Sequence, residues 1–156
     1  MRISLFCTAM VFILGVCCLV AAGSAHVDAE LRGGYYTNAD NGFLGGGFLT
    51  SVGQSWDFNP NVEWVLVDGF DYFTVNGDFH YDLDPTSSTA MWVGAGGAIV
   101  VQDWDDRFSR ARNDTDVGIN LFGGIGAKRG DVRPFGQIKG LLADRSEGSL
   151  ALGIRF

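Results

Sequence analysis

Two histidines are the only side chains in this 156-residue sequence with an ordinary pKa near neutrality, and neither stands in a catalytic pattern. His26 follows a run of small residues near the start, and His80 lies in the stretch His-Tyr-Asp. A serine nucleophile needs a histidine within reach and an acid that orients it. The alternation around His80 places it on the same strand face as Asp78 and Asp82, where hydrogen bonding is the simpler role. We therefore predict no catalytic residues and no enzyme activity.

An acidic segment interrupted by three arginines extends over residues 103–115. Its carboxylates are hard oxygen ligands of the kind that hold calcium, but the spacing is not that of an EF-hand. A solvated loop whose charges pair with one another is the interpretation we favour, and its guanidinium groups also suit lipopolysaccharide phosphates. We predict no metal and no cofactor, and we take loop 103–115 as the candidate contact for an extracellular partner.

The first 25 residues have the composition of a secretory signal peptide. Arg2 precedes an apolar run over 3–22, and Gly-Ser-Ala at 23–25 supplies the small residues that signal peptidase requires. We predict that residues 1–25 are removed and that residues 26–156 form a single domain. An uncleaved membrane anchor is the alternative, because the apolar run is close to the length of a spanning helix.

The charge and the cysteine content exclude several classes of function for the remaining chain. The three cysteines (Cys7, Cys17 and Cys18) all fall within the predicted signal peptide, so the mature chain has neither a disulfide nor a thiolate metal site. Removal of Arg2 changes the formal net charge from −7 to −8. Nucleic acids require a basic surface, so we predict that this acidic chain does not bind them.

After the predicted signal peptide, apolar and polar residues alternate in eight segments separated by turn-forming residues. The segments are 29–37, 42–53, 56–67, 72–83, 90–102, 116–128, 132–143 and 147–156. In the last of them Leu150, Leu152 and Ile154 share one face with Phe156. A period of two predicts β-strands, because successive side chains of a strand point to opposite sides. Segments 42–53 and 90–102 are apolar on both faces, so their inward face is not assigned.

The polar faces indicate where these strands reside. They carry charges of both signs with few lysines, at Glu30, Arg32, Glu63, Asp78, His80, Lys139 and Arg155. A solvated surface would be richer in lysine and glutamate, whereas mixed charges suit a narrow lumen in which each charge finds a partner. Aromatic residues also lie towards segment ends, as in the girdles of transmembrane barrels: Trp56, Trp64, Tyr72, Phe73, Tyr81, Trp92, Trp104 and Phe156. We predict an all-β fold, an eight-stranded antiparallel up-and-down transmembrane β-barrel.

The sequence resembles the small eight-stranded outer-membrane barrels of the OmpA-like and opacity-protein group. The resemblance covers the chain after the signal peptide and is carried by residues 115–156, which hold a Gly-rich strand, a tight turn, Arg-Pro-Phe and a closing strand that ends in phenylalanine. It implies a bacterial outer-membrane location with both termini in the periplasm, in contact with membrane lipids and lipopolysaccharide. It also implies that Leu152, Ile154 and Phe156 form the signal read by the barrel assembly machinery.

The predicted function is structural or concerned with surface interaction, because such a narrow barrel is filled by its own side chains. We expect a lumen network in which Arg155 and Lys139 neutralise Glu63 and Asp78, since buried charges must be paired. Two alternatives stay open, a soluble periplasmic lipocalin-like barrel that holds a small ligand and a barrel enzyme that modifies lipid A.

Overall fold

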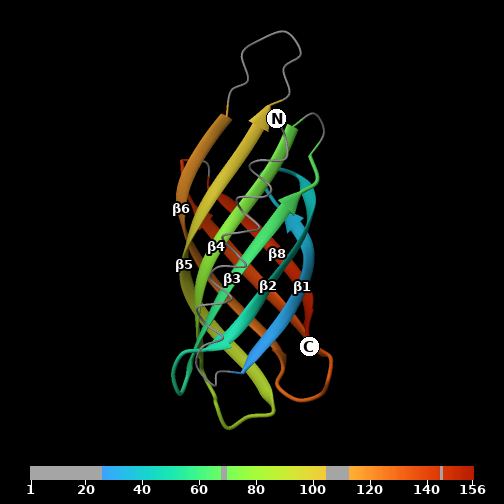
Figure 1. The fold of residues 1–156 in the computed structure, drawn as a ribbon, viewed down its shortest axis with the longest axis vertical. Coiled ribbons are helices and arrows are strands. Elements are labelled where there is room, and N and C mark those ends of the chain that lie inside the picture. The colour runs from blue at the N-terminus through green and yellow to red at the C-terminus, as the bar shows by residue number, and fades with distance from the viewer. Residues whose placement is uncertain (1–25, 68–69, 105–112, 145) are drawn as a thin grey trace.

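The chain folds into a closed barrel of eight antiparallel strands, each paired with its neighbours in sequence, and β1 pairs with β8. This computed structural model describes residues 26–67, 70–104, 113–144 and 146–156 (Figure 1). The strands are β1 (Val27–Tyr36), β2 (Asn41–Ser51), β3 (Trp56–Val65), β4 (Phe70–Asp82), β5 (Thr89–Trp104), β6 (Asn113–Ala127), β7 (Arg133–Leu142) and β8 (Glu147–Arg155). The predicted fold class is confirmed.

Each strand coincides with one predicted segment, and the largest difference in bounds is at the start of β6, which begins three residues before its predicted segment. Strands β5 and β6 pair from Thr89↔Ala127 to Asp103↔Asn113, so the predicted loop 103–115 is shortened to residues 105–112. The predicted signal peptide, residues 1–25, and residues 105–112 lie outside the part of the chain that the structure describes.

The barrel wall is apolar on its outside. Leu152 exposes 69% of its surface and Val117 73%, whereas Arg155, on the opposite face of β8 from Leu152, exposes 6%. The predicted inward faces of the third, fourth, seventh and eighth segments are confirmed, because Glu63, Asp78, Lys139 and Arg155 are all buried. The structure also shows which face of segments 42–53 and 90–102 points inward. Phe43 of β2 and Trp92 of β5 are buried, whereas Leu44 and Val93 are exposed.

The predicted aromatic girdle is partly wrong. Tyr72 and Trp92 are buried in the lumen, because the alternation of β4 and β5 turns them inward. Three cross-strand aromatic pairs on the outer wall all lie on β3 and β4: Trp56–Tyr81, Phe58–Phe79 and Trp64–Phe73, with ring centroids 5.0, 4.9 and 6.0 Å apart.

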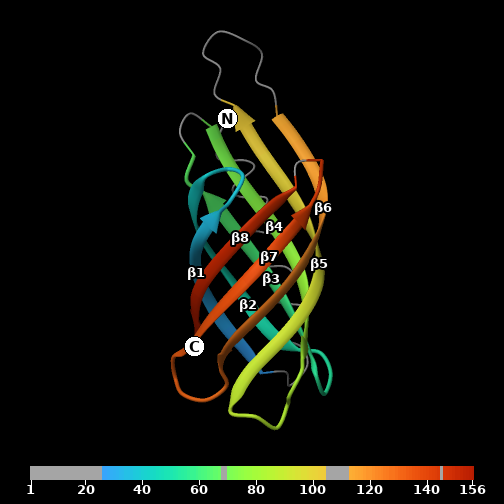
Figure 2. The ribbon, with the colours of Figure 1, turned by 180° about the vertical axis from the view of Figure 1, so that it is seen from behind.

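The strand connections divide between the two ends of the barrel. The connections β1–β2, β3–β4, β5–β6 and β7–β8 join strand ends that lie at one end of the barrel, which we call the loop end, as the two opposite views show (Figures 1 and 2). The start of β1, the end of β8 and the other three connections lie at the opposite end, which we call the termini end. There Ala29 and Phe156 exchange two backbone hydrogen bonds, of 2.9 and 3.0 Å, which close the barrel. Among the described residues, no helix has the length and apolar character needed to cross a membrane.

The outer wall leads to a first prediction, that Leu152→Arg impairs insertion into lipid. Arginine near the bilayer midplane costs about 2–4 kcal/mol, because lipid cannot solvate its charge. Val132→Arg is the matched control, since Val132 is also exposed but lies in the β6–β7 turn. Both variants are refolded into lipid vesicles and their folded fractions compared; equal folding would show that Leu152 does not face lipid.

Candidate functional site: the network in the lumen

The barrel lumen is filled by side chains, with apolar clusters towards its two ends and polar groups between them. The cluster nearer the loop end consists of Tyr36, Phe43, Val65, Tyr72, Ala98, Val100, Leu141 and Ala151. The cluster nearer the termini end consists of Trp92, Phe122 and Phe135. Each of the seven predicted lumen residues exposes 6% or less of its surface. The polar groups therefore lie in a region that the protein itself shields from both mouths.

Glu63 of β3 is the centre of the charged part of the network. Its carboxylate accepts hydrogen bonds from Lys139 Nζ at 2.7 Å and from Arg32 Nη1 at 3.2 Å, and both contacts are ion pairs. The hydroxyl groups of Tyr36 and Thr74 donate to its other oxygen. One carboxylate thus joins side chains from β1, β3, β4 and β7.

Glu30 of β1 extends this cluster to the strand that closes the barrel. Its Oε1 accepts from Arg32 Nε at 2.7 Å and also from Arg32 Nη2, and its Oε2 accepts from Arg155 Nε at 2.8 Å. Glu30 and Arg155 are direct neighbours across the β1–β8 pairing. The connected ion cluster therefore contains Glu30, Arg32, Glu63, Lys139 and Arg155, which are three cations and two carboxylates.

Asp78 belongs to an adjoining chain of amides. It accepts from Asn61 Nδ2 at 3.0 Å and from Asn120 Nδ2 at 2.8 Å. Asn76 donates to Asn61 Oδ1 at 3.0 Å, and its own Oδ1 accepts from Asn120 at 2.9 Å. Arg32 Nη2 donates to Asn59 Oδ1 at 2.7 Å and so links the amides to the ion cluster.

The predicted pairing of the lumen charges is therefore right for Lys139 and wrong for Arg155. Lys139 is paired with Glu63, as expected, but Arg155 is paired with Glu30. Asp78 is bonded to amides instead of a cation. Arg155 reaches Glu30 because the closing register makes them neighbours, whereas Glu63 lies on β3, across the lumen.

His80 lies among aromatic rings at the edge of the network. Its ring is stacked on Trp92, with centroids 5.8 Å apart and an angle of 21°, and lies 4.8 Å from the ring of Phe122. Arg155 is held beside the same rings, with Cζ 4.7 Å from the centroid of Trp92 and 4.4 Å from that of Phe135. This position inside the lumen separates His80 from any lipid outside the wall.

The amides are the part of the network that a search for charged residues missed. Asn59, Asn61, Asn76 and Asn120 are buried, as is Gln137, whose Oε1 accepts from Trp92 Nε1 at 3.3 Å. The alternation that identified the charges places Asn61, Asn76, Asn120 and Gln137 on the same inward faces. A search for every inward hydrogen-bonding group would have found those four.

Small residues make room for this network. A Cβ added at Gly45 of β2 would lie 2.7 Å from the carbonyl oxygen of Val62, 3.1 Å from Glu63 Cγ and 3.2 Å from Arg32 Cγ. Gly45 is the direct cross-strand neighbour of both Arg32 and Glu63. The glycine therefore gives the two long charged side chains the space in which they meet.

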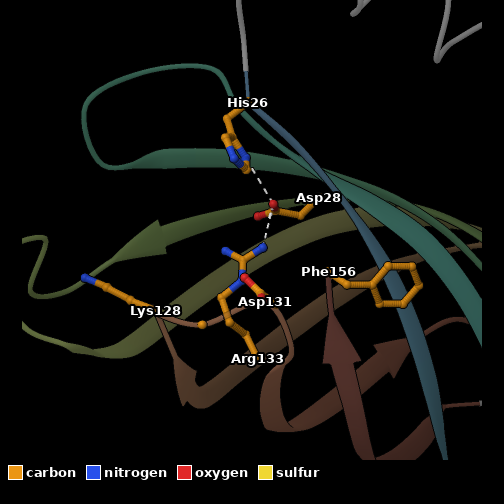
Figure 3. A pocket seen from close by; sticks show the side chains of 7 residues that line it. His26, Asp28, Lys128, Asp131, Arg133 and Phe156 are labelled. Atoms are coloured by element: carbon orange, nitrogen blue, oxygen red, sulfur yellow. Dashed lines mark ion pairs between the residues drawn. The ribbon is translucent and has the colours of Figure 1, made fainter.

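An open pocket of about 420 Å³ lies at the mouth of the barrel, at its termini end. Asp28 stands between His26 and Arg133 and is paired with both, at 3.0 Å to His26 Nδ1 and 2.5 Å to Arg133 Nη2 (Figure 3). The remaining lining residues are Lys128, Gly130, Asp131 and Phe156. Within the described part of the chain, no group of three or more His, Cys, Asp or Glu side chains could hold a metal ion.

The architecture has counterparts among solved structures. The chain is similar to the N-terminal β-barrel domain of Pseudomonas aeruginosa OprF, with a TM-score of 0.63 and 15% identity over 83% of this chain and 96% of that one. Neisserial surface protein A gives a TM-score of 0.63 and 12% identity over 85% and 98% of the two chains. The fold is that of the small eight-stranded outer-membrane barrels.

A third similar structure is Ail, the attachment invasion locus protein of Yersinia pestis, solved in complex with the heparin analogue sucrose octasulfate. Its TM-score is 0.56 and its identity 10%, over 84% of this chain and 99% of that chain. No protein-family model matches this chain, and no curated protein matches it in sequence. At these identities the likeness concerns the fold and carries no residue roles across.

Proposed function

We propose that this protein is a bacterial outer-membrane barrel with a structural or surface-interaction role and a lumen closed to solutes. The observation that carries the proposal is the combination of an apolar outer wall with a polar lumen. An apolar cluster closes this lumen towards each end of the barrel. An outer wall of this kind is stable in lipid, and a side-chain-filled lumen leaves no aqueous channel.

The distribution of polar groups favours this proposal over the soluble lipocalin-like alternative. A soluble barrel turns polar residues outward and keeps an apolar cavity for its ligand. Here Leu152, Ile138 and Val117 are exposed, while Glu30, Glu63 and Asp78 are buried. Water would therefore meet the apolar face, and a lipocalin-type ligand would meet charges that are already paired.

The placement of the histidines favours a non-catalytic role. An enzyme that modifies lipid A meets its substrate from the membrane, so its base must be reachable from the outer wall. His80 is enclosed by Trp92 and Phe122 in the lumen, and His26 lies at the open pocket of the termini end. Neither histidine is positioned to meet a lipid at the outer wall.

We further propose that the loop end faces the exterior and contacts lipopolysaccharide, and that the termini end faces the periplasm. In the described part of the loop end, hydrogen bonds join neighbouring connections, which suits a surface that presents contacts. The Glu147 carboxylate accepts from the backbone N–H groups of Asn38 and Ala39 at 3.1 and 3.3 Å, joining the β1–β2 turn to β8. Residues 105–112, the central part of the proposed partner loop, lie outside the described residues.

Planar-bilayer recording and cell fractionation test the main proposal together. We expect the protein in the outer-membrane fraction and, after reconstitution, no large steady conductance. Arg155→Ala should raise the leakage of ions through the barrel, because it removes the cation that joins Glu30 to the aromatic rings near the termini end. A stable open channel in the natural protein would contradict a closed lumen, and recovery in the soluble periplasmic fraction would contradict membrane insertion.

The proposed assembly signal is tested by Phe156→Ala. The backbone bonds between Phe156 and Ala29 do not require the ring, so we expect the purified variant to refold with little loss of stability. In cells we expect slower arrival at the outer membrane and more proteolysis, because the resemblance assigns the ring to recognition by the assembly machinery. Normal delivery of the variant to the outer membrane would show that the assembly machinery does not recognise Phe156. Poor refolding in vitro would show that the ring has a structural role.

A further inference from the structure

Two asparagine–glycine dipeptides occur in this sequence, and the fold places them in opposite surroundings. They are Asn41-Gly42, where the chain leaves the β1–β2 turn, and Asn76-Gly77, in the middle of β4. In such a dipeptide the glycine nitrogen can attack the side-chain amide of the asparagine, because glycine has no Cβ to obstruct the approach. The attack also requires the asparagine backbone to leave the extended conformation of a strand. The fold therefore decides which of the two amides reacts.

Asn76 is held from both sides. It exposes 4% of its surface and is paired with Asn61 of β3 and with Ala98 of β5. Its Nδ2 donates to Asn61 Oδ1 and to Thr74 Oγ1, both at 3.0 Å, and its Oδ1 accepts from Asn120 at 2.9 Å. To react, this residue would have to leave two strand pairings and part of the lumen network. Such an opening approaches global unfolding of the barrel.

Asn41 is the first residue of β2 and is held from one side. It pairs with Tyr36 of β1, and the described register of β2 with β3 does not include it. Its Nδ2 donates to the carbonyl oxygen of Ala39, in its own turn, at 2.5 Å. Gly42 accepts a bond from Leu66 N at 2.8 Å through its carbonyl oxygen, not through the nitrogen that would attack. The end of a strand opens locally at a small cost in free energy, so the reactive conformation is accessible here.

We propose that Asn41 is a site of spontaneous deamidation and that the fold protects Asn76. The Gly42 nitrogen loses its proton to the solvent and forms a bond to Asn41 Cγ, and Nδ2 leaves as ammonia. Water then opens the resulting cyclic imide at either of its carbonyl carbons. The product is an aspartate or, when the chain afterwards runs through the side-chain carbon, an isoaspartate.

Either product adds a negative charge to the loop end, beside Asp40. Asp40 has a left-handed backbone, with φ of 54°, and its carboxylate accepts from the Tyr35 hydroxyl. An isoaspartate also lengthens the backbone by one atom, which displaces position 41 from its pairing with Tyr36. The modification therefore changes both the charge and the shape of the β1–β2 turn as the protein ages.

Peptide mapping by mass spectrometry, on the natural protein aged in detergent at mildly alkaline pH, tests the proposal. We expect the Asn41 peptide to gain the mass of an amide-to-acid conversion and to separate into aspartate and isoaspartate forms, while the Asn76 peptide keeps its amide. In concentrated urea both should convert at similar rates, because the two dipeptides are then equally free. An Asn41 amide that survives in the folded protein as long as that of Asn76 overturns the proposal, and so does equal conversion of both in the folded protein.

Gly42→Ala is the variant that tests the attacking nitrogen. A Cβ added at Gly42 would lie 3.6 Å from the Gly34 carbonyl oxygen, an ordinary contact, so the barrel should still fold. We expect deamidation of Asn41 to slow several-fold, because the added methyl group obstructs the attack. Gly77→Ala is the control and should leave the rate at Asn41 unchanged, since its Cβ would also make only ordinary contacts. An undiminished rate in Gly42→Ala overturns the proposed route, and if that variant does not fold, the comparison of Asn41 with Asn76 in the natural protein decides.

Discussion

Glu63→Ala should destabilise the folded barrel by about 3–5 kcal/mol, the usual cost of leaving a buried ion pair with one partner. The substitution removes the only carboxylate bonded to Lys139 and one of the two bonded to Arg32 within the described network. Tyr36 and Thr74 lose their acceptor as well. Urea titration of the protein refolded in lipid vesicles, followed by tryptophan fluorescence, measures the free energy of unfolding.

A double-mutant cycle distinguishes the unpaired charge from a simple loss of packing. Glu63→Ala combined with Lys139→Ala should be more stable than Glu63→Ala alone, because no ammonium group is then left unpaired, and Arg32 keeps Glu30. Glu147→Ala is the control, since this glutamate bonds to backbone N–H groups at the loop end and its loss should cost about 1 kcal/mol. If Glu63→Ala costs no more than Glu147→Ala, the lumen network does not stabilise the barrel.

The alternation of residues was sufficient to predict the strands and the charges that face the lumen. In β4, Thr74, Asn76, Asp78 and His80 fall at every second position, and all four are buried. This signal is local, because neighbouring side chains of a strand must point to opposite faces. The approximate strand bounds and the inward set of ionisable residues could therefore be read without any knowledge of how the strands pair.

The partners of those charges depend on the register of the closed barrel, which the alternation does not contain. Arg155 meets Glu30 because β8 pairs with β1 in the register Glu30↔Arg155. Lys139 of β7 meets Glu63 of β3 across the lumen, between strands that are not neighbours. Several pairings satisfy the same inward set of charges, and only the three-dimensional closure selects among them.

The packing of the aromatic residues in the lumen could not be predicted from alternation alone, and the inward face of the segment that contains Trp92 was not assigned. Trp92 and Phe122 lie in Gly-rich stretches of β5 and β6 that combine apolar residues with glycine on the inward face. Their strands pair as Trp92↔Gly124 and Gly94↔Phe122, so each ring lies opposite a glycine. The pattern becomes apparent only when the two strands are aligned, and it accounts for Gly94 and Gly124.

Gly94→Ala should therefore destabilise the barrel by about 1–3 kcal/mol, the usual cost of overpacking a filled interior. A Cβ added at Gly94 would overlap the Phe79 carbonyl oxygen of the neighbouring strand and the ring of Phe122. The backbone of β4 cannot withdraw without loss of its pairing with β5, and the ring is confined by His80. The free energy of unfolding in urea, measured on the refolded protein, gives the size of the effect.

Gly97→Ala is the matched control in the same strand. Gly97 points to the outside of β5, and a Cβ added there would have no atom within 4 Å. Alanine loses less backbone freedom than glycine on folding, so this substitution should be neutral or should stabilise the barrel by up to about 1 kcal/mol. Opposite signs for Gly94→Ala and Gly97→Ala would show that the inward glycine provides space for the lumen ring and that the outward one does not. Equal effects would mean that both glycines act through the backbone alone.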